Sequence, residues 1–78
     1  MPTIHQDGPF RFFFYANDRK EPRHVHIERD EKRAKFWLNP VRVAENVGFG
    51  KAELNRLLEI VVSNEAAFTR EWDAFFGS

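Results

Sequence analysis

Two histidines stand two residues apart in a segment that has the pattern of a β-strand. His24 and His26 alternate with Val25 and Ile27, and side chains two apart in a strand point to the same face, with Cα atoms roughly 6–7 Å apart. An imidazole with a pKa of about 6.5 can donate or accept a proton at neutral pH. Two imidazoles at this spacing can also bind one Zn²⁺ ion. The segment is therefore a candidate for acid–base chemistry or for a metal site.

The aromatic run at residues 10–15 and a strand pattern at 33–38 bring further side chains to these histidines. If the three segments pair as strands, their alternation separates an apolar face from a polar and aromatic one. The polar face, called the outer face below, would hold Arg11, Phe13, Tyr15, His24, His26, Glu28, Lys35 and Trp37. An aromatic cluster rimmed by charge is typical of an interaction site. We therefore expect the function to lie on the outer face.

Acid–base catalysis without a metal is one interpretation of this face. A small ribonuclease needs groups that move protons and a cation that neutralises the phosphate in the transition state. The catalytic candidates are His24, His26, Glu28 and Arg11, with Lys35 as a second phosphate-binding cation. The aromatic rings of the outer face would stack RNA bases, as in RNA readers built on a sheet. This interpretation depends on the strand register, because a slip of one residue would move these side chains to the other face.

A metal site is a second interpretation. His24 and His26 would supply two ligands to Zn²⁺, and Glu28, Glu21 or His5 is a candidate for the third. The chain has no cysteine, which excludes thiolate ligands, disulfides and cysteine nucleophiles. No helical zinc motif accompanies the pair. We therefore expect no cofactor, with zinc bound by the two histidines as the alternative.

A protein–protein surface is the third interpretation and the leading one. Tyr, Trp, Phe and Arg are enriched at interface hot spots. A chain of 78 residues buries only about 60 % of its unfolded surface, so a dimer or a hetero-complex would add stability. The binding-surface candidates are Phe13, Tyr15, Lys35, Trp37 and Glu21.

A fourth interpretation assigns no chemistry to the outer face. Both faces of the sheet would then be packed, and the histidines would bond to loop backbone. Glu28 would form an ion pair with Arg11 or Lys35. For His5 this structural role is the expected one.

Charge and hydropathy limit the partners and the location. The formal net charge is zero, with a balance of +2 in residues 1–50 (nine Lys/Arg, seven Asp/Glu) and −2 in residues 51–78 (three and five). Strong duplex DNA binding requires a far more basic domain, whereas RNA or a charged protein remains a candidate partner. We find no signal-peptide pattern and no apolar run near the roughly 20 residues that span a bilayer. We therefore expect no membrane association and a cytoplasmic protein.

The periodicity predicts strands first and helices last. Alternation indicates strands at about 2–6, 10–16, 24–29, 33–38 and 41–43, with Asp7-Gly8 as a hairpin turn. From residue 51 the apolar spacing becomes helical, which predicts helices at 51–63 and 65–76, or one kinked helix, with Gly77 as the C-cap. This order favours one α+β domain over residues 1–78. Its four- or five-stranded, mainly antiparallel sheet would have two C-terminal helices packed on one face.

Several segments resemble the small prokaryotic domain-of-unknown-function family numbered 4160. They are Met1–Ile4, Glu21–Ile27, Ala34–Leu38, and Asn46–Phe49 followed by Glu53-Leu54. The similarity covers nearly the whole chain, and its most recognisable part is Glu-Pro-x-His-Val-His. Genes of this family often lie beside another small uncharacterised domain, an arrangement similar to toxin–antitoxin modules. The resemblance thus implies a cytoplasmic bacterial or archaeal protein that works with a small protein partner, as a ribonuclease toxin or as the binding component, and it assigns no catalytic residue.

Overall fold

A five-stranded antiparallel sheet is followed by two helices in the computed structural model, which describes residues 3–77. The strands lie in sequence order and are β1 (Thr3–Asp7), β2 (Phe10–Phe13), β3 (His24–Arg29), β4 (Lys32–Trp37) and β5 (Arg42–Val47). A short 3₁₀ helix, η1 (Ala16–Lys20), connects β2 to β3, and the helices are α1 (Lys51–Ser63) and α2 (Glu65–Phe76). The predicted α+β fold is confirmed.

The strand register separates the two faces of the sheet as the alternation predicted. Phe12 pairs with Ile27, which pairs with Ala34, and all three belong to the core on the helix side. Their neighbours Phe13, His26 and Lys35 pair in the same order and therefore point to the outer face.

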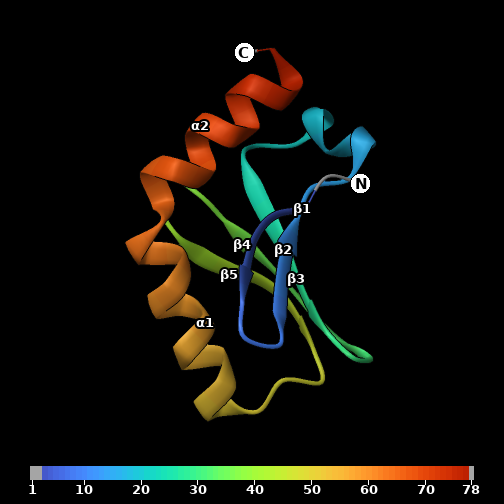
Figure 1. The fold of residues 1–78 in the computed structure, drawn as a ribbon, viewed down its shortest axis with the longest axis vertical. Helices are drawn as coiled ribbons and strands as arrows, with labels where there is room; N and C mark the ends of the chain where they lie inside the picture. Colours follow the sequence, from blue (N-terminus) through green and yellow to red (C-terminus); the bar gives the residue numbers. More distant parts are fainter. Residues whose placement is uncertain (1–2, 78) are drawn as a thin grey trace.

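Both helices lie along one side of the sheet (Figure 1). Their apolar stripes cover the phenylalanine-rich face and complete a single core. Its buried members are Phe10, Phe12, Phe14, Val25, Ile27, Ala34, Phe36, Leu38, Phe49, Leu57, Val61, Phe68 and Trp72. Full burial of a side chain such as Leu or Phe contributes about 1.5–3 kcal/mol, so this cluster is the main source of stability in a small domain.

The helical segment is two helices, as predicted, and Asn64 separates them. Its Nδ2 donates to the carbonyl of Ile60 at 2.8 Å, and its own carbonyl accepts the first bond of α2, from the N–H of Phe68 at 2.8 Å. Gly77 ends α2 with a φ of 76°. This left-handed conformation, which glycine adopts without a steric penalty, confirms the predicted C-cap.

Several predicted strand boundaries are corrected by the structure, and the strand expected over 33–38 runs from Lys32 to Trp37. The strand expected over 10–16 ends at Phe13, because Phe14 is fully buried against α2 and η1 begins at Ala16. The strand expected over 41–43 extends to Val47, because β5 pairs along β4 with a bulge at Lys35/Phe36. The first strand runs to Asp7 rather than ending at residue 6, and residue 2 lies outside the described residues.

η1 and the C-terminal half of α2 lie at the same end of the molecule (Figure 1). An ion pair also joins α2 to the segment just before β3: Nη2 of Arg23 lies 2.6 Å from Oδ1 of Asp73. No helix among residues 3–77 is both long and apolar enough to cross a membrane.

Candidate functional site

The register of β2, β3 and β4 assembles the outer face that the sequence predicted. Phe13 stands opposite His26, and His26 opposite Lys35. Two residues earlier in β3, His24 stands opposite Trp37. The two histidines therefore project to the same side of the sheet, with ring centroids 5.0 Å apart.

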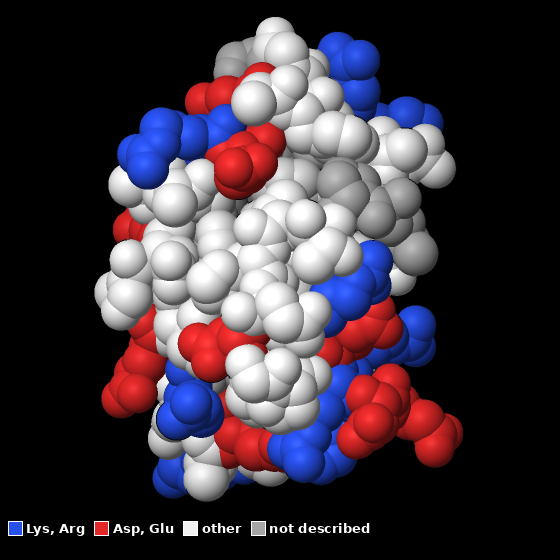
Figure 2. Space-filling model, viewed as in Figure 1, with Lys and Arg blue, Asp and Glu red and all other residues white. Residues whose placement is uncertain are grey.

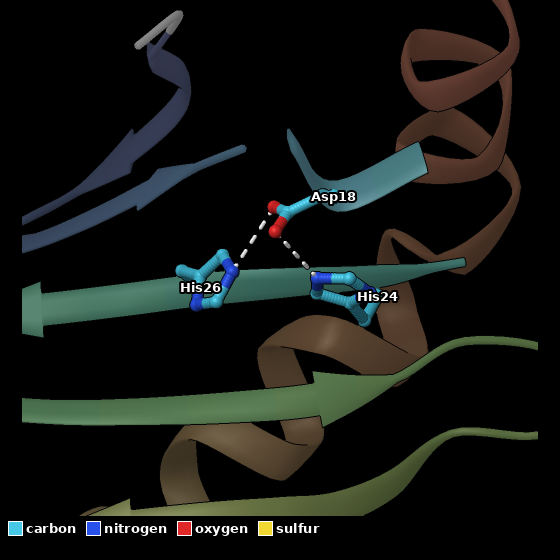
Figure 3. A group of neighbouring side chains, drawn as sticks. All are labelled: Asp18, His24 and His26. Atoms are coloured by element: carbon cyan, nitrogen blue, oxygen red, sulfur yellow. Dashed lines mark hydrogen bonds and ion pairs between the residues drawn. The ribbon is translucent and has the colours of Figure 1, made fainter. Parts of the chain in front are cut away.

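Asp18, which the sequence analysis did not select, lies between the two histidines (Figure 3). Its Oδ1 is 3.2 Å from Nε2 of His24, and its Oδ2 is 3.0 Å from Nε2 of His26. The backbone N–H of Tyr15 donates to the same Oδ2 at 2.8 Å, which fixes the carboxylate at the start of η1. The only sequence signal was an acid in the polar loop before β3, since no periodicity relates that loop to the strand.

His24 is fully buried, which differs from the exposed position expected of a catalytic residue. Its Nδ1–H donates to the carbonyl of Pro22 at 2.8 Å, and its Nε2 has no hydrogen-bond partner among residues 3–77. The ring packs between Trp37 and Trp72, with centroid distances of 5.6 and 5.0 Å. α2, and not only the sheet, therefore encloses this imidazole.

His26 keeps part of its surface, with 18 % of its side chain exposed. Its ring stacks on Phe13 at 5.5 Å and meets the edge of Tyr15 at 4.6 Å. Burial lowers the pKa of His26 below its usual 6.5, and the nearby Asp18 carboxylate only partly opposes this shift. The His26 imidazole is therefore neutral at pH 7, with Nε2–H donating to Asp18.

The charged candidates of the outer face pair with one another. Arg11 forms an ion pair with Glu28 and lies over the Phe13 ring, 4.3 Å from its centroid. Lys35 pairs with Glu21, and this hydrogen bond lowers the pKa of Glu21 below its usual 4.5. These pairs match the packed arrangement expected if Arg11 and Glu28 carry no chemistry.

None of the three predicted third ligands lies with the histidine pair. Glu28 and Glu21 form ion pairs with Arg11 and Lys35. His5 packs on the helix side against Phe12 and Phe68, with ring centroids 5.2 and 5.6 Å apart. The carboxylate that replaces them is that of Asp18, because η1 folds over the outer face.

A shallow groove of about 200 Å³ opens on the outer face beside His26. Its lining residues are Tyr15, His26, Arg33, Ala34, Lys35, Glu45 and Val47. Phe13 is buried, and Trp37 instead lines a separate hollow beside Pro22 and Arg42. The aromatic candidates therefore do not form one exposed cluster, and Tyr15 is the ring that reaches the groove.

Comparison with known proteins identifies a family. A family model described as Domain of unknown function (DUF4160) matches residues 10–73. No curated protein and no solved structure matches the chain. The matched range includes Asp18, His24, His26 and all residues that line the groove.

Proposed function

This chain belongs to the DUF4160 family, and on that premise we propose that it is the binding component of a toxin–antitoxin-like two-gene module. It acts through a small protein partner that contacts the outer face at the groove beside His26. The same proposal places the protein in the cytoplasm.

The groove supports this proposal because it combines apolar and charged surface. Tyr15 is 36 % exposed and Val47 is 53 % exposed, and these side chains would lose water-accessible apolar area on binding. Arg33 stands on the same rim and forms no ion pair within residues 3–77. A partner segment with an apolar side chain and a carboxylate would match both features.

The edge of the sheet at β5 is the observation that carries the proposal. β5 is the last strand in the order β1-β2-β3-β4-β5, so one side of its backbone pairs with no other strand described here. Most of its side chains are exposed. An exposed edge of this kind is a template for an added strand, and peptides that bind in this way place alternate side chains in adjacent pockets.

Co-purification with the product of the neighbouring gene tests this function. We expect a stable complex by size-exclusion chromatography with mass measurement, and Val47→Asp should weaken it by at least about tenfold, because it places a charge in the apolar part of the interface. Val62→Asp is the matched control, since Val62 is similarly exposed (55 %) but lies on α1.

Three results would contradict the proposal. The first is a protein that stays at 9.3 kDa in the presence of the neighbouring product. The second is a homodimer that forms alone and excludes that product. The third is a complex that Val62→Asp weakens as much as Val47→Asp.

Metal-independent cleavage of RNA by the two histidines receives less support. A general acid and a general base must both reach the substrate, and His24 has no exposed surface. Incubation with total RNA checks the enzymatic alternative: cleavage that a His26→Gln variant abolishes would replace the binding function with catalysis.

Strong duplex DNA binding also receives no support. The face in Figure 2 carries mixed charge, with no continuous area of Lys and Arg.

A further inference from the structure

We infer that Asp18, His24 and His26 form a binding site for one divalent transition-metal ion of the zinc class. Their ligand atoms all lie within 4.8 Å of one another. One carboxylate comes from η1 and two imidazoles from adjacent outward positions of β3 (Figure 3). The inference goes beyond the proposed binding function, and its test uses the isolated protein.

The unpaired Nε2 of His24 is the strongest observation. This atom is buried and has no hydrogen-bond partner among residues 3–77, while its Nδ1–H already donates to Pro22. This Nε2 lies 3.2 Å from Oδ1 of Asp18 without forming a hydrogen bond to it. A buried polar atom without a hydrogen bond is unfavourable, and a cation bound by this nitrogen and the Asp18 carboxylate would satisfy both groups.

The direction of the contact also fits a metal ion. A hydrogen-bond acceptor lies on the axis of the ring nitrogen. When a metal ion binds the nitrogen, the ion itself lies on this axis. A second ligand of the same ion therefore lies to one side of the axis. The Asp18 Oδ1 lies 3.2 Å from Nε2 of His24 without a hydrogen bond between them, which agrees with the position of a second ligand.

The ligand atoms of the three residues would need to move only slightly to bind one ion. Metal–ligand bonds of about 2.0–2.2 Å place the ligands of a tetrahedral ion about 3.3 Å apart. Nε2 of His24 lies 3.2 Å from Oδ1 of Asp18, and Nε2 of His26 lies 3.0 Å from Oδ2 of the same carboxylate. With one ligand atom from each residue, no pair needs to close by more than about 1.5 Å. On binding, the Nε2 proton of His26 would move to Nδ1 of the same ring, which frees the lone pair for the metal.

The donor set and its surroundings select the class of metal. Two imidazoles and one carboxylate suit zinc or ferrous iron, whereas calcium and magnesium prefer oxygen ligands. Metal-binding histidines typically donate their other N–H to a backbone carbonyl, as His24 does to Pro22. Three protein ligands also leave a coordination position open for water.

Such an ion would connect η1 to the sheet. Asp18 belongs to η1, and Tyr15 at its start lines the groove. Metal binding would therefore hold one wall of the groove in place without contacting the partner directly.

Titration of the protein with Zn²⁺ by calorimetry, and with Co²⁺ by visible absorption, tests the site. We expect one ion per chain, and Asp18→Asn or His26→Gln should lower the affinity by at least about tenfold. His5→Gln is the matched control, because His5 lies on the opposite face of the sheet, and it should bind as the wild type does. The two ligand variants keep the test valid if one of them does not fold.

A measurement on the wild-type protein decides the case independently. Long-range ¹H–¹⁵N spectra of the imidazoles should show Zn²⁺ shifting Nε2 of His24 and His26, with the His5 ring unchanged. The absence of saturable binding, or shifts confined to His5, would overturn the inference. Equal loss of affinity in His5→Gln and His26→Gln would overturn it as well.

Discussion

The imidazole of His24 packs against the indole of Trp72, with ring centroids 5.0 Å apart. This contact joins the first residue of β3 to the middle of α2. The same indole meets Phe14 at 5.2 Å, where the chain leaves the sheet to form η1. Trp72 thus supports two elements of the candidate site, the strand that carries the histidines and the segment that leads to Asp18.

Truncating Trp72 should cost both stability and the position of His24. We expect Trp72→Ala to lower the free energy of unfolding by about 3–5 kcal/mol, because it leaves a large cavity in the core. Trp72→Phe should cost less. Urea titration measures the loss, and Phe75→Ala, at a ring that is 45 % exposed, is the control that should cost clearly less. An equal loss at the two positions would contradict a central role for Trp72.

The Arg11–Glu28 ion pair should contribute little to stability. The side chains of Arg11 and Glu28 are 26 % and 35 % exposed, so solvent screens their attraction. A double-mutant cycle of Arg11→Ala and Glu28→Ala should give a coupling energy of about 1 kcal/mol or less. A coupling of several kcal/mol in thermal or urea unfolding would show that this pair is a principal part of the outer face.

Glu53 should make stability depend on acidic pH. A hydrogen bond from Lys32, and then the charges of Lys32 and Arg29, lower the pKa of Glu53 below its usual 4.5. The unfolded chain therefore binds this proton more readily, and the stabilisation is present above pH 4.5 and lost as the pH falls through the lowered pKa. Glu53→Gln should remove this part of the acid dependence in urea titrations at several pH values. The prediction is contradicted if the free energy of unfolding of Glu53→Gln falls with acid as steeply as that of the wild type.

Gly48 should resist substitution, because its φ is +98° and an added Cβ would lie 3.1 Å from Cγ of Lys32. We expect Gly48→Ala to cost about 1–3 kcal/mol, since a non-glycine residue is strained there. Gly50→Ser is the control: φ is −74° at this N-cap of α1, nothing would crowd the new Cβ, and serine is a favoured N-cap. Thermal unfolding of the two variants should therefore differ clearly, and similar melting temperatures would refute the strain.

Local pattern predicted the helices and the two faces of the sheet well. The bounds 51–63 and 65–76 agree with α1 and α2, because the helical period and the break at Asn64 are properties of neighbouring residues. The alternation of residues 10–13 and 24–28 likewise placed His24 and His26 on one face. The length of β5 was underestimated, because its later residues are held by pairing with β4 and have little strand pattern of their own.

The composition of the site was predicted only in part. Asp18 was missed because η1 carries it over the outer face by a turn that no periodicity indicates. The burial of His24 was missed because Trp72, far away in the chain, covers it. Glu21 and Glu28 were considered as ligands, yet Glu28 is paired with Arg11 on β2 and Glu21 with Lys35 on β4.

The sequence alone determined the order of the elements, the division of the sheet into two faces and the shared direction of the two imidazoles, because side-chain direction within a strand or helix follows from local backbone geometry. Only the tertiary structure decided which imidazole is buried, which carboxylate meets the pair and where the groove opens. Burial and ligand geometry depend on contacts between segments that are distant in the chain, here β3, η1 and α2.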